Sequence, residues 1–558
     1  LSNELDRYRQ IIDPIRKVAM LGIPALLGLF AGLGSAGTWP QFLLWMNREP
    51  FGRVDPEFGL DVGFYVFELP VFNAVIGFVS TILVLSAVGT ALTGFLYGAI
   101  SLNGRELRIS RTMRIQLGII GVLYFAVQAV NLWLQQYDTL VSQSGGFLAF
   151  GAGFTEVNAT IPARAIMAGI AILVALLFLV TAIVGRWRLA VVGTALYIVS
   201  GLVLGLGYPA LIQRFQVDPS ARTLEADYIQ RNIEATRDAY AISDVVEINY
   251  EASTDTSAGA LRADAETTAN IRIIDPALVT DAFSQLEQFR QYYQFPQFLD
   301  VGRYEINGEK TDTVLAAREI NLDGLNSQSW YNNTIVYTHG YGMVAAYGNQ
   351  RTEDGQPRFI ESGIPVSETL GEYEPRIYFG ENTPPYSIVG GPEGSTPLEL
   401  DFPSGGEGNE NNATYTFSGD GGPKLDSLFA QLLYALKFQS EQIILSDAIT
   451  SDSQILYDRH PADRVQKVAP YLTLDNDPYP AVVDGRVVWI VDGYTTTSDY
   501  PYSTPVNVSE AIADTYQPAP QLAFDTVNYM RNSVKATVDA YSGEVKLYAW
   551  DTEDPLLS

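Results

Sequence analysis

The feature that most constrains this chain is a series of long stretches without a charged side chain, all within the first 212 residues. They lie at about 18–38, 71–100, 115–134, 165–184 and 189–212. Each reaches the roughly 20 residues that a helix needs to cross about 30 Å of hydrocarbon. Because a helix satisfies its backbone hydrogen bonds within one segment, it can cross a bilayer without water. Buried helices of a soluble core are the alternative, but five such stretches favour a membrane α-helical bundle with five spans.

The charge distribution changes abruptly near Ile212. Up to that residue the chain has 13 Lys and Arg residues against 11 Asp and Glu residues, so the remainder carries 22 basic and 52 acidic side chains. The sequence therefore predicts two parts, a transmembrane domain at 1–212 and an acidic α+β domain at 213–558. A strongly acidic surface excludes nucleic acid as a partner, since phosphate binding needs clustered Lys and Arg. The chain has no cysteine, which excludes disulfides and thiol chemistry.

The basic residues that flank the spans predict the orientation. Ten of them fall in the three segments on one side of the membrane: Arg7, Arg9, Arg16, Lys17, Arg105, Arg108, Arg111, Arg114, Arg186 and Arg188. The opposite loops carry only Arg48, Arg53 and Arg164. By the positive-inside rule the ten-residue side is cytoplasmic. We therefore expect a multi-pass plasma-membrane protein whose residues after about 212 are extracytoplasmic.

The first span is not expected to be a signal peptide, because it is followed by Trp39-Pro40 rather than by a cleavage site. Leu1 is not a methionine. We therefore expect the natural protein to start earlier, with further spans before Leu1, and the outer domain to be shortened at its C-terminal end.

Glycine pairs four residues apart predict close packing between spans. They are Gly28 with Gly32, Gly94 with Gly98, and Gly201 with Gly205. Such pairs let two helix backbones approach closely, although they also arise by chance in Gly-rich spans. No Asp, Glu, Lys, Arg or His lies within the core of a predicted span, whereas proton relays and ion-coupled transporters usually need such a residue. This pattern favours a structural bundle over a transport path.

The second part has the alternating patterns and turn signals of short strands. Asn307-Gly308, Asp484-Gly485 and Tyr541-Ser542-Gly543 each separate two such runs and predict hairpins. A strongly apolar stretch, Leu425–Ile449, contains Lys437 and Glu441. Its internal charges predict a helix of a soluble domain rather than a sixth span.

Three segments resemble a known family. They are Arg48–Pro70, with the sequence REPFGRVDPEFGLDVGFYVFELP, Tyr337–Gly342, with YTHGYG, and Arg464–Pro480 continuing into Trp489–Thr497, with WIVDGYTTT. In these segments the chain resembles uncharacterised protein family 0182, a family of large bacterial membrane proteins. The resemblance implies a multi-span protein with a large outer domain, longer than this chain and with about seven spans. It implies no activity and no catalytic residues.

The two histidines are the first candidate ligand-binding residues. His339 lies in a Gly-flanked aromatic segment, where glycines let a backbone approach a ligand, so it could bind a sugar or act as a base. The simpler interpretation is a tight turn with a hydrogen-bonded histidine. His460 lies between Asp458 and Asp463, and either carboxylate could orient its ring. A helix-entry cap is the simpler interpretation there.

The sequence identifies no cofactor. Calcium fits it better than zinc, because calcium binds carboxylate and carbonyl oxygens, whereas two histidines and no cysteine argue against a zinc centre. Asp475 and Asp477 are the candidate ligands, although Tyr479 occupies the third oxygen position of an EF-hand loop. An acidic turn is the simpler interpretation. With 52 acidic residues in the second part, some carboxylates will lie close together, but the sequence does not indicate which pair.

Three functional hypotheses remain open at this stage. The first is an envelope scaffold or interaction module that binds proteins, glycans or lipids without catalysis, with the bilayer and either other envelope proteins or a second copy as partners. The second is an envelope enzyme acting on polysaccharide or a lipid-linked substrate, which predicts a deep pocket with two carboxylates whose pKa values differ. The third is a component of a transporter or lipid conduit, which requires a polar path through the spans.

Overall fold

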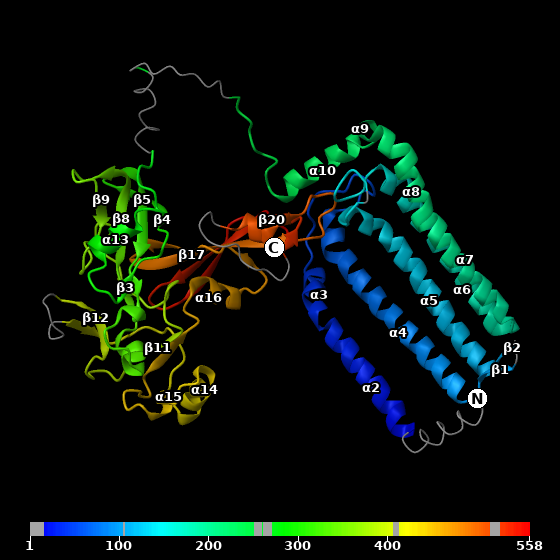
Figure 1. The fold of residues 1–558 in the computed structure, drawn as a ribbon, viewed down its shortest axis with the longest axis horizontal. Helices are drawn as coiled ribbons and strands as arrows, with labels where there is room; N and C mark the ends of the chain where they lie inside the picture. The colour runs from blue at the N-terminus through cyan, green and yellow to red at the C-terminus, as the bar shows by residue number, and fades with distance from the viewer. Residues whose placement is uncertain are drawn as a thin grey trace.

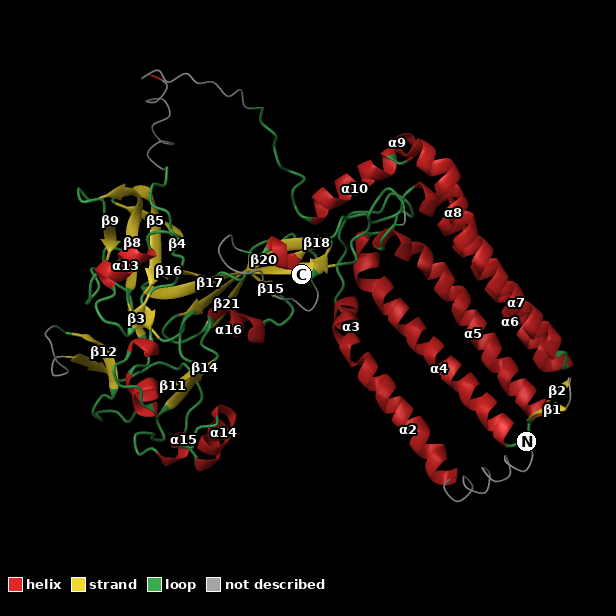
Figure 2. Ribbon diagram, in the orientation of Figure 1, coloured by secondary structure: helices red, strands yellow, loops and turns green. Residues whose placement is uncertain are grey.

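The computed structural model describes residues 16–103, 106–144, 146–249, 259, 271–404, 412–513 and 525–558. Its N-terminal part contains five long apolar helices, and its C-terminal part is rich in β-sheet (Figures 1 and 2). The order of a helical part followed by a sheet-rich part agrees with the sequence prediction, and the predicted boundary at 212 stays a prediction. Arg7, Arg9 and Arg105, which contribute to the predicted orientation, lie outside the described residues.

Five helical segments are long and apolar enough to cross a membrane, as judged by length and composition. They are Leu21–Met46, Phe64–Leu96, Arg111–Val141, Glu156–Val184 and Trp187–Leu224. The helices of this part are α2 (Arg16–Ser35), α3 (Trp39–Met46), α4 (Leu69–Leu96), α5 (Arg111–Asp138), α6 (Ile161–Val184), α7 (Trp187–Ser200), α8 (Tyr208–Ile212), α9 (Ala221–Leu224) and α10 (Ala226–Ala239). All five predicted spans are therefore confirmed as long apolar helices.

Two predicted helix boundaries are wrong. The second span was expected to reach Ile100, but α4 ends at Leu96 and Gly98 has a φ of +72°, which ends the helix. Ile100 instead begins β1 (Ile100–Asn103), which pairs with β2 (Glu106–Ile109). The fifth helix does not end at Ile212, because π-helical and 3-10 turns continue it as far as Leu224.

The helices pack unequally. α5 and α6 are in close contact. A Cβ atom added to Gly118 on α5 would lie only 2.7 Å from the Cβ of Ala182 on α6. α2 lies apart from the other helices in Figure 1, and none of the most apolar residues of its segment is buried. Even in the segment that contains α6, only 39% of the residues in its most apolar 18-residue stretch are buried. Much of the apolar surface of the helices therefore faces outward.

The sheet-rich part contains two main antiparallel sheets. The first has the strand order β4–β5–β8–β9, and the second has the order β15–β17–β20–β21 with β16 also paired to β17. Their bounds are β4 Asp300–Ile306, β5 Glu309–Ala317, β8 Met343–Arg351, β9 Pro357–Glu361, β15 Thr473–Leu474, β16 Tyr479–Val483, β17 Arg486–Thr497, β20 Tyr529–Asp539 and β21 Val545–Ala549.

The predicted hairpin turns are confirmed. Asn307 and Gly308 have φ values of 55° and 85° between β4 and β5, and Asp484 and Gly485 have 49° and 74° between β16 and β17. Positive φ at both central positions is the type I′ geometry that Asn-Gly and Asp-Gly favour. Gly543, with φ 70°, likewise lies in the turn between β20 and β21.

The two main sheets share one hydrophobic core. Leu315 of β5 and Met343 of β8 pack in the same cluster as Trp489 of β17 and Val538 of β20. The indole N–H of Trp489, which is only 1% exposed, donates a 2.8 Å hydrogen bond to the carbonyl of Phe379. The segment Trp489–Thr497, on which the family resemblance partly rests, therefore contributes Trp489 and Val491 to this core.

Smaller strands and helices surround the two sheets. They are β3 Tyr293–Gln294, β6 Glu319–Ile320, β7 Gly340–Tyr341, β10 Arg376–Ile377, β11 Tyr386–Val389, β12 Glu399–Pro403, β13 Asn412–Tyr415, β14 Gln454–Tyr457, β18 Val506–Asn507, β19 Thr526–Val527, α13 Thr280–Glu287, α14 Leu428–Phe438, α15 Gln442–Leu445, α16 Pro461–Val468 and α17 Val508–Ala511. The apolar stretch Leu425–Ile449 is thus two short helices rather than one, because Gln439 has a φ of 51° and ends α14.

Candidate functional site

The first candidate site is the junction between the helices and the sheet-rich part (Figure 1). It consists of the loops at 47–63 and 139–155, α10, and the segment Asp499–Thr504. The N–H of Tyr502 donates to the carbonyl of Leu140 at 2.9 Å, and the side-chain amide of Asn232 on α10 donates to the carbonyl of Tyr502 at 2.5 Å. Both backbone groups of Tyr502 are therefore bound by residues from the helical part.

Apolar side chains from both parts of the chain also form common clusters at the junction. The buried ring of Tyr502 packs with Leu69 of α4 and Leu140. Tyr500 and Tyr529 of the sheet-rich part pack with Val66 and Phe67 in a second cluster. The two parts therefore share buried apolar surface and are not merely tethered by a linker.

Within the family-like segment Arg48–Pro70, two carboxylates organise the loop before α4. Asp55, which is only 2% exposed, accepts hydrogen bonds from the N–H groups of Phe58 and Leu60 and from the hydroxyl of Tyr65. Asp61 accepts from the N–H groups of Phe51, Gly52 and Gly63. These bonds give the loop the fixed shape against which the sheet-rich part packs.

Charged groups complete the junction. Arg231 of α10 pairs with Glu57 at 3.1 Å, and the hydroxyl of Tyr500 donates to Asp238 at 2.5 Å. Burial, followed by the nearby charge of Asp238, raises the pKa of Tyr500 above its ordinary value of 10. Burial, with a smaller effect from Asp138, raises the pKa of Asp499 to about 6. The buried polar groups of Tyr500 and Asp499 therefore depend on close contact between the two parts.

The second candidate site surrounds His339, which is 1% exposed. The hydroxyl of Thr338 lies 2.8 Å from its Nδ1, and the Oδ1 of Asp401 lies 3.5 Å from its Nε2. Arg376 donates two hydrogen bonds to Asp401, at 2.7 and 2.8 Å. Burial acts to raise the pKa of Asp401, but contacts with His339 and Arg376 outweigh it and hold that pKa below its ordinary value. His339 is therefore enclosed among charged partners, and its role as a ligand stays a prediction.

Glu399 connects this cluster to a cavity. Its carboxylate accepts hydrogen bonds from the hydroxyls of Thr338 and Tyr378 and from the N–H groups of Gly390 and Phe417. These four donors fix the carboxylate between His339 and the cavity wall. Glu399 is therefore placed to hold the wall in shape.

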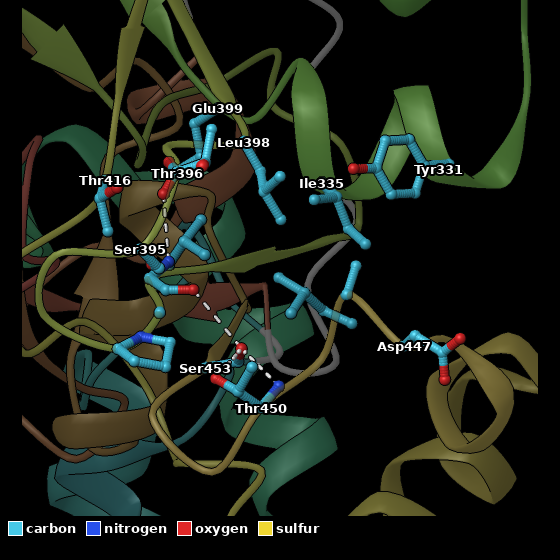
Figure 3. A pocket seen from close by; sticks show the side chains of 16 residues that line it. Tyr331, Ile335, Ser395, Thr396, Leu398, Glu399, Thr416, Asp447, Thr450 and Ser453 are labelled. Atoms are coloured by element: carbon cyan, nitrogen blue, oxygen red, sulfur yellow. Dashed lines mark hydrogen bonds between the residues drawn. The ribbon is translucent and has the colours of Figure 1, made fainter.

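The cavity itself has a volume of about 370 Å³ and is bounded partly by β11 and β12 (Figure 3). Five serine and threonine hydroxyls line it, from Ser395, Thr396, Thr416, Thr450 and Ser453. Tyr331 and Asp447 lie on its other side in Figure 3. Hydroxyls, an aromatic ring and a carboxylate are the groups that can bind the hydroxyls and the apolar face of a sugar.

A third site contains buried carboxylates. Burial raises the pKa of Glu319 to about 7, although hydrogen bonds from Asn382 act in the opposite direction. Burial, followed by the negative charges of Glu319, Asp300 and Asp477, raises the pKa of Glu381 to about 9. Asp300 and Asp477 line a cavity of about 590 Å³. At neutral pH Glu381 is therefore protonated, while Glu319 lies near its midpoint.

The side chains of the two candidate calcium ligands, Asp475 and Asp477, have different surroundings. Asp475 accepts hydrogen bonds from the N–H of Asp477 at 3.2 Å and the hydroxyl of Tyr494 at 3.1 Å. Asp477 lines the cavity of the third site. Across the part of the chain that the structure describes, no group of three or more His, Asp or Glu residues could hold a metal ion. Calcium binding stays a prediction.

His460 precedes the first residue of α16 as its N-cap, as the simpler interpretation expects, but its side chain makes no capping hydrogen bond. Burial lowers its pKa, and the charge of Asp463 acts in the opposite direction. Its predicted role as a ligand is not tested by this geometry.

The glycine pairs have different surroundings. A Cβ atom at Gly28, Gly32 or Gly205 would meet no atom within 4 Å, and one at Gly201 would lie 3.5 Å from Met167. Gly94 is buried on α4. The pairing of Gly94 with Gly98 is wrong, because Gly98 lies beyond the end of the helix. Packing at the other pairs stays a prediction.

The sequence analysis did not identify the residues of two contacts, the one between α5 and α6 and the one between Asn232 and Tyr502. Gly118 and Gly121 of α5 lie against α6, and their spacing of three residues on one uncharged helix face could have indicated this. Asn232 and Tyr502 are 270 residues apart in the sequence. No local pattern indicates that they meet.

The first prediction concerns the junction. Replacing Asn232 by alanine leaves the buried carbonyl of Tyr502 without this donor, which costs about 1–3 kcal/mol. We expect amide hydrogen exchange in the segment 499–506 to become roughly 10- to 100-fold faster, as measured by mass spectrometry.

Gln230→Ala on the same helix is the matched control, because the amide of Gln230 donates to the exposed side chain of Glu234 on the same helix. It should leave exchange in that segment unchanged. Equal exchange in both variants would show that Asn232 does not hold the junction.

The second prediction concerns pH. Because the folded-state pKa of Glu381 lies above its ordinary value of 4.5, the folded protein binds more protons than the unfolded chain between these values, and its free energy of unfolding falls as pH rises toward 9. In Glu381→Gln the side chain stays neutral. Between pH 7 and 9 we expect this variant to lose about 1–3 kcal/mol less stability than the wild type, as measured by denaturant titration.

The exposed Glu353 provides the control, since Glu353→Gln should follow the wild-type pH dependence. If Glu381→Gln also followed it, the carboxyl of Glu381 would not be held protonated in the folded protein.

The amino-acid sequence is similar to those of known proteins. The whole chain, residues 1–558, matches the model of a family described as "Uncharacterised protein family (UPF0182)". A UPF0182 protein of Clavibacter michiganensis is 59% identical over 557 residues, which cover 100% of this chain and 56% of that protein. The corresponding protein Lxx09300 of Leifsonia xyli is 56% identical over 558 residues, again 100% of this chain and 56% of that protein.

A more distant relative, protein TW644 of Tropheryma whipplei, is 51% identical over 560 residues, which cover 100% of this chain and 58% of that protein. The chain therefore spans somewhat more than half the length of these relatives. No solved structure gives a significant match.

Proposed function

Because the chain belongs to the uncharacterised protein family UPF0182, whose description names no activity, we propose a function from its own structure: an integral membrane protein of the bacterial cell envelope whose sheet-rich part is an extracytoplasmic scaffold or interaction module. The observation that carries the proposal is the outward-facing apolar surface of the five long helices. Leu173, Ile183 and Leu206, for example, are 61%, 73% and 67% exposed. Surface of this kind over five helices is stable in a bilayer and unfavourable in water.

The arrangement of the helix ends supports the orientation. Arg114, at the start of α5, lies next to Gly185 at the end of α6, opposite to the junction. Basic side chains therefore gather at the end of the bundle away from the sheet-rich part. By the positive-inside rule this end is cytoplasmic, and the sheet-rich part is then outside.

The junction supports a scaffold rather than a loosely attached domain. Hydrogen bonds to Tyr502 and the common apolar clusters fix the sheet-rich part against the helix ends. A fixed domain presents the same surface to a partner at all times, which lowers the entropic cost of binding. The cavity beside Glu399, with its hydroxyl groups and Tyr331, suits an envelope glycan as one such partner.

Polar side chains within the helices bond to one another. The amide of Gln116 donates to Thr90 at 3.1 Å, and the amide of Asn131 donates to Gln128 at 3.3 Å. Such pairs join neighbouring helices or stabilise one helix within lipid. They favour a structural bundle over the transport hypothesis.

The third prediction tests the topology. Since the chain has no cysteine, single cysteines can be introduced without background. In intact cells a membrane-impermeant maleimide should label Glu353→Cys, on the sheet-rich part, and leave Arg188→Cys unlabelled until the cells are lysed.

Both positions are described as exposed in the structure, so access depends on the membrane and not on burial. Labelling of Arg188→Cys but not of Glu353→Cys in intact cells would reverse the proposed orientation. Labelling of both would contradict the proposed membrane sidedness.

A second candidate function is hydrolysis of an envelope polysaccharide or a lipid-linked sugar. The observation that favours it is the pair Glu319 and Glu381. Burial raises their pKa values to about 7 and about 9, so that at neutral pH Glu319 is partly ionised and Glu381 is protonated. General acid–base chemistry requires such a difference.

The fourth prediction tests this candidate. If Glu381 is a general acid, Glu381→Gln should reduce the release of soluble sugar from isolated envelope polysaccharide by roughly 100-fold or more, as measured by mass spectrometry. Glu353→Gln should release as much as the wild type. No release by the wild-type protein, or equal release by Glu381→Gln, would exclude this role for Glu381.

A further inference from the structure

An exposed apolar face on the sheet-rich part has no partner in the described structure. It lies on α14 and α15, and we call it the α14–α15 face. On α14 its residues are spaced by one, three, one and three positions, so that they occupy one side of the helix. Its residues are Leu428, Phe429, Leu432, Leu433, Leu436 and Leu445, with exposed fractions of 74%, 69%, 45%, 49%, 68% and 73%.

This pattern is the reverse of that of an ordinary surface helix. A helix on a soluble domain places polar residues toward water, yet the segment Ser427–Leu436 contains no charged side chain. The opposite side of α14 is already occupied, since Ala435 is buried against Ile335 and Ile455. The exposed leucines are therefore not a core that the chain could bury by rotating the helix.

Aromatic contacts fasten α14 firmly to the sheet-rich part. The ring of Phe438 stacks on Tyr386 with centroids 4.4 Å apart, and the ammonium group of Lys437 lies 3.7 Å from the ring centre of Tyr457. The charge of Lys437 is thereby directed back toward the protein. These contacts hold the apolar face outward and in a fixed orientation.

The position of the α14–α15 face relative to the helices indicates that a bilayer would cover it. The helices run from the junction toward the lower right of Figure 1, in a view along the shortest axis of the molecule. A bilayer around them lies perpendicular to their axes, so its outer surface extends from the junction toward the lower left. α14 and α15 lie at the lower end of the sheet-rich part, to the lower left of the junction in this view.

From these observations we infer that the α14–α15 face inserts into the outer leaflet of the bilayer that the helices span. The inference rests on the proposed membrane function. Leucine and phenylalanine on one face of a short helix are the groups that bury themselves at the boundary between headgroups and acyl chains. α14 has 11 residues, too few to cross the hydrocarbon, so the helix lies in the interface.

This second contact has a mechanical consequence. The sheet-rich part would be held at two places, by the junction and by the α14–α15 face. The surface between them would then keep a constant height above the membrane. The uncharged composition of the face binds zwitterionic lipid as well as anionic lipid, because the attraction is to the acyl chains and not to headgroup charge.

The fifth prediction measures depth in the membrane with nitroxide spin labels on single cysteines, in the full chain reconstituted into phosphatidylcholine liposomes. Leu433→Cys and Phe429→Cys report on the face, Leu173→Cys on α6, and Glu353→Cys on the exposed turn between β8 and β9. Collision rates with oxygen, which concentrates in lipid, and with a nickel chelate, which stays in water, are compared by electron paramagnetic resonance.

We expect the ratio of oxygen to nickel collisions at both labels on the face to be several-fold higher than at Glu353→Cys and to approach that at Leu173→Cys. A low ratio on the face with a high ratio at Leu173→Cys would overturn this inference and leave the proposed membrane function intact. A low ratio at Leu173→Cys would overturn both. Protection of the face from both reagents, with broadening between labels, would instead indicate contact with a second copy and overturn lipid insertion.

Discussion

The relation between the two parts of the molecule depends on the hydrogen bonds to the backbone of Tyr502. Its N–H donates to the carbonyl of Leu140, in the turn after α5, and its carbonyl accepts from the side-chain amide of Asn232 on α10, so that one residue of the sheet-rich part is bound by two segments of the helical part. A buried backbone group without a partner costs free energy comparable to a lost hydrogen bond. Separation of the two parts would expose these groups together with the ring of Tyr502, and the junction is therefore a single cooperative contact.

The two parts of the chain differ in the side chains that they expose. The helices present apolar side chains outward, while the sheet-rich part is acidic and encloses its own cores. The α14–α15 face departs from this division, since it places a cluster of exposed apolar side chains on the acidic part. With the proposed insertion of this face into the bilayer, the junction and the α14–α15 face would hold the sheet-rich part along the membrane surface.

The interior of the sheet-rich part contains charged groups that are bound by several partners each. Arg459, 2% exposed, donates to the carbonyls of Thr338 and Tyr378, and Glu399 accepts four hydrogen bonds. Removing one partner of such a group leaves a buried charge uncompensated, which is more costly than the net gain from the pair. These networks fix the positions of segments that are distant in the sequence, including the segment that contains His339.

The five apolar helices, the charge break near Ile212 and the hairpin turns could be predicted from the sequence, because they depend on side chains that are close together in the chain. Asn307-Gly308 needs only its own backbone preference to form a turn. The junction, the enclosure of His339 by Asp401, and the exposed side of α14 were decided by tertiary structure alone. Each depends on residues that are far apart in the sequence, and burial of a helix face is fixed by what packs against it, not by the residues of the helix itself.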